Sequence, residues 1–265
     1  MHAKGPRRCT FLQAHSHDLE SEINGISTLP KSFVHLRQES TTRLRSICLA
    51  FSFHICHNKS FSSAYTETTT IKRRTEYMAI KIFIDQGHNP QNPNAGAEGN
   101  GVREQDITYE VGVILAALLN NDSDFEARLS RNSPTEILGT SNTTSLQTRV
   151  YEANLWGADY FISLHCNSNP NPNSSGSEAY VYSADSTAFN MALRILQGLN
   201  YNTGLENRGV FVRPTLYVLR ATDMPSVLVE MGYISNGHDA YLMSNDPESF
   251  AMGIYNGILL YYGLL

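Results

Sequence analysis

The chain has 265 residues, 41% of them hydrophobic, which is enough for the core of one large domain or two small ones. Charge divides it: residues 1–77 hold 11 Lys+Arg and 6 Asp+Glu, whereas residues 78–265 hold 9 and 19. The acidic second part disfavours nucleic-acid binding, the absence of a P-loop or dinucleotide-binding glycine motif leaves nucleotide use without support, and no apolar run reaches the roughly 18 residues of a transmembrane segment.

Residues 1–77 show neither a sustained helical period nor strand-like alternation, and Ser, Thr, His and Arg are frequent among them. We expect a disordered N-terminal extension. A second hypothesis is that this part is mis-annotated, because Lys72-Arg73-Arg74 can be encoded by purine-only codons resembling a ribosome-binding site shortly before Met78. A genuine basic tail is the alternative, and the export route stays open.

From Met78 onward, short apolar runs alternate with amphipathic segments, which is typical of an α/β domain. We predict one domain over residues 78–265, with a twisted, mostly parallel, six-stranded sheet and helices on both faces. The predicted strands are Ile80–Ile84, Phe125–Leu129, Tyr160–Leu164, Glu178–Tyr182, Tyr217–Leu219 and Val227–Glu230. The predicted helices cover 107–118, 144–157, 186–200 and 247–262.

Two predicted strands lead into histidines, His88 and His165. Side chains at adjacent carboxyl ends of a parallel sheet converge, so the two imidazoles could share one zinc ion. Glu104 is the best third ligand because it opens the helix after the 89–101 loop, whereas Glu98 lies in the loop and Asp106 points elsewhere around the helix. The alternative for each histidine alone is a hydrogen-bonded core residue.

Glu230 follows the apolar run VLV in the last predicted strand and is therefore expected to be buried. A buried ionised carboxylate is costly unless it is paired or functional. The spacing leaves two readings open, a functional carboxylate and a salt bridge to an arginine such as Arg149 or Arg213.

Six segments in order carry a resemblance: IFIDQGH, GNGVREQD, LQTRVYEANLWGADYFISLHCNSN, GSEAYVYS, NRGVF and TDMPSVLVEMGYISN. The chain resembles the zinc-dependent N-acetylmuramoyl-L-alanine amidases of the amidase-3 (LytC-type) family over nearly all of residues 79–265. The resemblance implies hydrolysis of the amide bond between N-acetylmuramic acid and the L-alanine of the peptidoglycan stem peptide. It also implies one zinc ion held by His88, Glu104 and His165, with Glu230 as the catalytic acid and base.

Further positions are weaker candidates. Asn167 follows His165 by two residues and could orient substrate or cap the loop, while Arg213 and Arg220 flank a predicted strand and could meet the acidic stem peptide. The resemblance implies a peptidoglycan or muropeptide substrate and a place at the cell wall, outside the cytoplasmic membrane, or in the cytoplasm until release for a phage lysin; we expect a monomer. A zinc carboxypeptidase or aminopeptidase and an inactive wall-binding module are the alternatives.

Overall fold

The computed structural model describes residues 78–265, so the predictions for the first 77 residues lie outside the described part of the chain. Its main feature is a six-stranded sheet with the strand order β4-β1-β5-β8-β6-β7. The strands are β1 Ile80–Gln86, β4 Phe125–Leu129, β5 Tyr160–Asn167, β6 Ser177–Val181, β7 Asn207–Val212 and β8 Ser226–Tyr233. A two-stranded hairpin, β2 Glu98–Gly99 and β3 Val102–Arg103, precedes the first helix.

Strand direction divides the sheet into two parts. Strands β4, β1, β5 and β8 are mutually parallel, whereas β6 pairs with β8 in the antiparallel sense and β7 runs parallel to β6. We call β6 and β7 the reversed flank. The predicted mostly parallel six-stranded sheet is thus confirmed. Because of the reversal, the amino-terminal ends of β6 and β7 lie on the same side of the sheet as the carboxyl-terminal end of β8.

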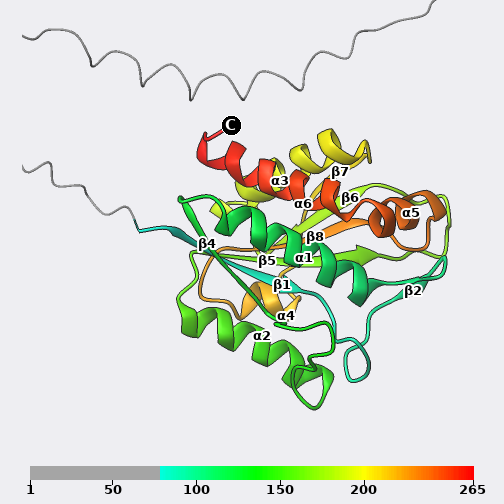
Figure 1. Cartoon of the computed structure of the whole chain (residues 1–265), viewed down its shortest axis with the longest axis horizontal. Helices are drawn as coiled ribbons and strands as arrows, with labels where there is room; N and C mark the ends of the chain where they lie inside the picture. Colours follow the sequence, from blue (N-terminus) through cyan, green and yellow to red (C-terminus); the bar gives the residue numbers. More distant parts are fainter. Residues whose placement is uncertain (1–77) are drawn as a thin grey trace, which may run out of the picture. The chain divides into compact units, whose positions relative to one another are not determined.

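Helices cover both faces of the sheet (Figure 1). One apolar core lies between the sheet and the helices α1, α3 and α6, and a second, smaller one lies under α2 and α4 on the other face. The helices are α1 Glu104–Asn120, α2 Asn142–Trp156, α3 Thr187–Thr203, α4 Tyr217–Arg220, α5 Gly237–Asn245 and α6 Pro247–Tyr262. None of those in residues 78–265 combines the length and hydrophobicity that crossing a bilayer requires.

Local sequence explains where the longer helices begin and how two of them pack. Ser141 and Thr144 form a reciprocal capping box at the start of α2, and Asp246 caps α6, whose first residue is Pro247. Helices α3 and α6 cross closely because Gly198 faces α6 without a side chain. A Cβ atom there would lie 2.1 Å from a backbone oxygen of α6.

One predicted strand was wrong. Tyr217–Leu219 forms the short helix α4, closed by a hydrogen bond from Arg220 N to Leu216 O. Its residue types favour strands, but Val218 and Leu219 are buried in the smaller core, so tertiary packing overrides the local preference. The sixth strand is β7 instead, which the sequence analysis missed because its residues are mostly exposed at the sheet edge.

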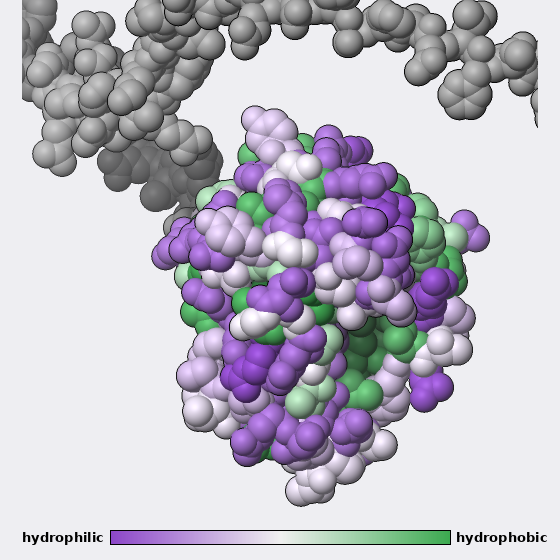
Figure 2. Space-filling view, turned by 90° about the vertical axis from the view of Figure 1, so that its right-hand side faces the viewer, coloured by the Kyte–Doolittle hydropathy of each residue, from purple (hydrophilic) through white to green (hydrophobic). Residues whose placement is uncertain are grey.

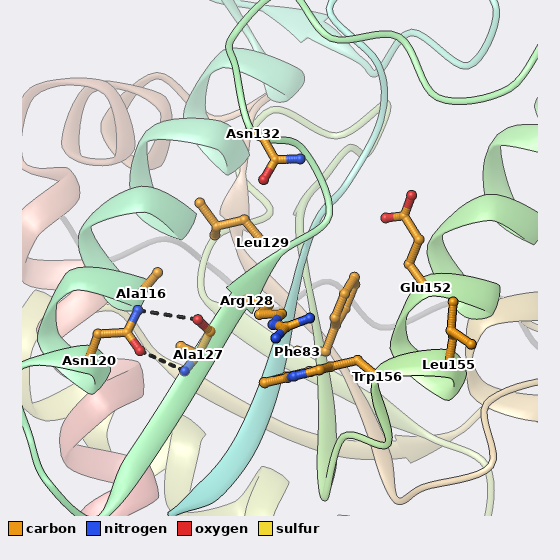
Figure 3. Close-up of a pocket in the computed structure, with 10 residues that line it drawn as sticks. All are labelled: Phe83, Ala116, Asn120, Ala127, Arg128, Leu129, Asn132, Glu152, Leu155 and Trp156. Carbon is orange, nitrogen blue, oxygen red and sulfur yellow. Dashed lines mark hydrogen bonds between the residues drawn. The ribbon is translucent and has the colours of Figure 1, made fainter.

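The opposite edge of the sheet, at β4, is closed by a side chain. The amide of Asn120 donates to Ala127 O at 3.2 Å and accepts from Ala127 N at 2.8 Å (Figure 3). Asn120 therefore occupies the backbone N–H and C=O of Ala127 in the middle of β4, which hinders the pairing of a further strand at this edge.

Candidate metal centre

The predicted site residues gather where β1, β5 and β8 end at their carboxyl termini, on the side of β2 and α5 (Figure 1). Figure 2 looks onto this side of the molecule. Hydrophilic residues cover most of it, and a hollow with hydrophobic residues in its floor opens between them. The parallel pairing of β1 with β5 brings together the two segments that carry the histidines, as the sequence predicted.

His88, Glu104 and His165 form one compact cluster. The carboxylate of Glu104 lies between the imidazoles, with Oε2 3.2 Å from His88 Nε2 and Oε1 2.9 Å from His165 Nδ1. One potential ligand atom from each residue lies within 4.8 Å of the others. No second cluster of three or more His, Cys, Asp or Glu residues with such spacing occurs among residues 78–265.

The protein backbone holds Glu104 in this position. Its side chain is buried, and its two oxygens accept hydrogen bonds from the backbone N–H groups of Ala97 and Cys166, both at 2.9 Å. Burial alone would raise the pKa of Glu104, but hydrogen bonds to His165 and His88 outweigh it and lower that pKa below its usual value. Glu104 is therefore an ionised acceptor at neutral pH.

His165 lies on β5 beside a residue without a side chain. A Cβ atom on Gly87 would lie 2.6 Å from the imidazole of His165, so glycine leaves the room that this ring occupies. Burial lowers the pKa of His165, but the hydrogen bond and charge of Glu104 outweigh that effect and raise the pKa to about 8. The negative carboxylate of Glu104 thus favours a positive charge at the position between the two imidazoles.

The donor set fits a zinc ion. Zinc takes imidazole nitrogen and carboxylate oxygen at about 2.0–2.2 Å, which in a tetrahedron places the ligand atoms roughly 3.4 Å apart. The contacts of 3.2 and 2.9 Å to the two imidazoles, made by the two oxygens of Glu104, are close to that spacing, and one ligand atom from each of the three residues lies within 4.8 Å of the others. Three protein ligands would leave a fourth position for water or substrate, as in catalytic rather than structural zinc sites.

Glu230 lies next to this cluster without a partner of its own. On β8 it is the register partner of His165 on β5, and its Oε2 is buried and accepts no hydrogen bond from residues 78–265. Burial, opposed by His165, raises the pKa of Glu230 to about 7. An arginine does not neutralise it in this part of the chain: Arg149, one partner considered from the sequence, pairs with Asp85 at 2.6 Å instead.

A second glutamate near the site was missed by the sequence analysis. Glu178 on β6 is the register partner of Glu230, and the side chains of directly opposite residues lie on the same face of a sheet. Unlike Glu230 it is well satisfied, because Tyr180, Tyr233 and Arg208 all donate to its carboxylate. Burial would raise the pKa of Glu178, but these three donors lower it.

The remaining predicted residues lie around or away from the cluster. Asn167 ends β5, and its side-chain oxygen accepts from Ser168 N at 2.8 Å, a local loop contact. Arg213 follows β7 and Arg220 ends α4, at the sheet end where β8 begins. The reversed flank therefore places Arg213, and α4 places Arg220, at the sheet end opposite to the one that carries His165.

The two carboxylates considered as weaker ligands lie outside the cluster. Asp106 pairs with Arg103 through contacts of 2.8 Å, and Glu98 is an exposed residue of the β2–β3 hairpin. Of the three acids weighed from the sequence, only Glu104 lies between the histidines.

A separate cavity of about 770 Å³ lies at the β4 edge, between α1 and α2 (Figure 3). Its charged lining residues are Arg128 and Glu152, and the guanidinium of Arg128 stacks over Trp156, 4.6 Å from the ring centre. No histidine or cysteine lines this cavity, so it lacks the groups that the chemistry of the metal cluster requires.

Comparisons with known proteins point to one family. A family model described as N-acetylmuramoyl-L-alanine amidase matches residues 82–259. The chain is 33% identical to N-acetylmuramoyl-L-alanine amidase CwlM of Bacillus licheniformis over 70% of each chain. It is 32% identical to the sporulation-specific N-acetylmuramoyl-L-alanine amidase of Bacillus subtilis, with 68% of this chain and 67% of that one covered.

Solved structures show the same relationship. The catalytic domain of the amidase CwlV from Bacillus (Paenibacillus) polymyxa var. colistinus superposes with a TM-score of 0.61 at 28% identity. The match covers 70% of this chain and 99% of that domain.

Proposed function

The chain belongs to the N-acetylmuramoyl-L-alanine amidase family, and from this we propose that it uses one zinc ion to hydrolyse the amide bond between N-acetylmuramic acid and L-alanine. That the chain is an amidase acting on peptidoglycan follows from the family match and the named relatives. The zinc requirement and the residue roles are the finer part of the proposal. The observation that carries them is the convergence of His88, Glu104 and His165 beside the unpartnered carboxylate of Glu230.

Three side chains would hold the ion. His88 and His165 offer one imidazole nitrogen each, and Glu104 offers a carboxylate that backbone N–H groups already fix in place. A bound zinc ion supplies Lewis-acid chemistry, acidifying a water molecule and polarising the scissile carbonyl. The rest of the reaction depends on the protein.

Glu230 is suited to move the proton. Its raised pKa, about 7, lets its carboxylate accept a proton from the attacking water at neutral pH and lets the resulting acid give it up again. The leaving group is the nitrogen of L-alanine, which departs poorly as an anion, so returning the proton to that nitrogen completes the hydrolysis. Because Glu230 has no hydrogen-bond donor of its own among residues 78–265, neither step requires breaking an existing contact.

The proposal extends to the organisation of the protein. We assign catalysis to residues 78–265, which contain the whole family match. This unit would act as a monomer on cell-wall peptidoglycan outside the cytoplasmic membrane. The chain is also 28% identical to an endolysin of Bacillus phage SPP1. A role as a phage lysin, held in the cytoplasm until release, is therefore the alternative.

A muropeptide assay tests the proposed function. The full-length protein, stripped with a chelator and then supplied with one equivalent of zinc, should release from muropeptides the stem peptide with a free L-alanine amino terminus. The stripped protein should release none, and the zinc-supplied Glu230→Gln variant should bind the ion without hydrolysis. Release of C-terminal amino acids instead would indicate a carboxypeptidase, and full activity of the stripped protein would refute the zinc requirement.

A further inference from the structure

The imidazole of His88 lacks the support that metal-binding histidines usually have. Such a histidine normally donates its second ring nitrogen to a carboxylate, carbonyl or water, and this contact fixes the ring orientation. In His88, Nε2 faces Glu104, whereas Nδ1 is buried and has no hydrogen-bond partner in the described part of the chain. The ring must therefore be oriented by other means.

The backbone of His88 is also unusual. Its φ angle is 70°, in the left-handed region that residues with a side chain rarely adopt. Such a conformation persists only where the surrounding structure holds it. The contacts that hold this turn should therefore set the position of the imidazole.

Arg149 supplies these contacts from the facing helix α2. Its guanidinium is buried and donates through Nη2 to the backbone oxygen of His88, and through Nη1 to the backbone oxygen of Gln86 at 2.6 Å. Nη2 also reaches Asn89 Oδ1 at 3.3 Å. One planar group thus binds the residues before, at and after the position with the left-handed backbone.

Asp85 connects the same guanidinium to the second histidine strand. One carboxylate oxygen accepts from Arg149 Nη1 at 2.6 Å, and the other accepts from the hydroxyl of Ser163 at 2.8 Å. Ser163 lies on β5, two residues before His165. The buried pair of Arg149 and Asp85 therefore touches both segments that carry a metal-binding imidazole.

We propose that Arg149, fixed by Asp85, is a positioning residue that sets the His88 imidazole for metal binding through its backbone. The inference rests on the proposed zinc site, but it assigns the support of that site to a residue which touches neither the ion nor the substrate. A lysine cannot replace the arginine, because one ammonium group lacks the planar fork that reaches Asp85 and the His88 carbonyl together.

Zinc affinity and the cobalt spectrum of the full-length protein test this inference. Zinc dissociation constants are measured by competition with a chelator for the parent, Arg149→Lys and Leu196→Ala. Leu196 is a buried residue of α3 in the larger core, so its truncation destabilises the fold without touching the turn at His88. The visible absorption of the Co²⁺-loaded proteins reports the geometry of the ligands separately from affinity and activity.

We expect Arg149→Lys to weaken zinc binding by about 10- to 100-fold and to change the cobalt spectrum, while Leu196→Ala leaves both unchanged. If Arg149→Lys does not fold, Asp85→Asn serves in its place, since its amide cannot accept from both Arg149 and Ser163, and it should weaken zinc binding several-fold. Unchanged affinity and spectrum, or equal losses in Leu196→Ala, would overturn the inference. A parent protein that binds no zinc would instead refute the proposed function itself.

Discussion

The parallel strands and the reversed flank meet where Glu230 of β8 pairs with Glu178 of β6, and the two glutamates have different surroundings. Glu230 on β8 belongs to the parallel part, has a buried oxygen without a donor from residues 78–265, and has a pKa raised to about 7. Glu178 on β6 accepts from three side chains, and its pKa is lowered. Two identical residues in register thus differ by their hydrogen-bond donors.

This difference separates the expected roles of the two regions. Leaving a carboxylate unsatisfied costs stability, so such a group persists where its proton is needed. A carboxylate with three donors is a structural anchor that also places negative charge beside its neighbour. We therefore expect the parallel part to supply the reacting groups, and the reversed flank to add the negative charge of Glu178 to the environment of Glu230, which burial dominates.

The largest effect is expected from the parallel part. His165→Ala removes one of the three proposed zinc ligands. If the ion is lost with it, activity on muropeptides should fall by about 10⁴-fold, a loss of several kcal/mol of transition-state stabilisation. Elemental analysis should find no zinc after dialysis. If the variant kept one zinc per chain and the rate of the parent, His165 could not be a zinc ligand.

Glu230→Gln should follow, with a loss of about 10²- to 10⁴-fold in kcat, the usual contribution of a general acid and base. Its zinc content should match that of the parent, because Glu230 is not one of the three proposed ligands. Steady-state kinetics together with metal analysis check both statements, and a loss of zinc in this variant would show that Glu230 binds the ion.

The stability of the metal-free protein should show the cost of the unpartnered carboxylate. Because folding raises the pKa of Glu230 from 4.5 to about 7, its contribution to stability is fully present below pH 4.5 and is lost as the pH rises through 7. The shift corresponds to at most about 3 kcal/mol. Glu230→Gln cannot ionise, so the metal-free variant should gain stability over the parent at pH 8 but not at pH 4.

Urea unfolding of metal-free parent and variant at the two pH values measures this difference. If parent and variant were equally stable at pH 8, Glu230 would ionise in the folded protein at no cost in stability. This result would contradict the difference between Glu230, which lacks a donor among residues 78–265, and Glu178, which has three.

The smallest effect is expected from the reversed flank. The negative charge of Glu178 raises the pKa of Glu230, so Glu178→Gln should lower that pKa and move the acid limb of kcat/KM to lower pH, by less than about one unit. Arg194→Met, an exposed residue of α3 that bonds Gln197, also removes one charge and is the control, so it should leave the limb in place. A shift of the same size in both variants would contradict the role assigned to Glu178.

Much of the candidate site could be predicted from the sequence because parallel strands impose a simple rule. The apolar strands before His88 and His165 are adjacent and parallel, so their carboxyl ends had to meet. Glu104 could be placed because it opens a helix, and Glu230 because it follows an apolar run. Local pattern and the geometry of a parallel sheet made these residues candidates but left alternatives open for the histidines and for Glu230. The family resemblance was needed to imply the ligand set and the role of Glu230.

The direction of β6 and β7 could not be predicted in the same way, because local pattern does not encode which way a strand runs. Arg213 was considered near the substrate because it flanks the predicted strand Tyr217–Leu219, which is instead part of α4. Arg208, at the start of the unpredicted strand β7, is the arginine that binds Glu178. The hydrogen bond from Arg149 to the His88 carbonyl could not be predicted from the sequence either. It depends on the left-handed backbone of His88, which only the folded chain displays.

The most direct test of the central claim is a crystal structure of the zinc-loaded protein with anomalous scattering measured at the zinc absorption edge. We predict one anomalous peak about 2.0–2.2 Å from a ligand atom of each of His88, Glu104 and His165, with the carboxylate of Glu230 nearby but outside the coordination sphere. A peak at another place, or one coordinated by Glu230 in place of Glu104, would contradict the account.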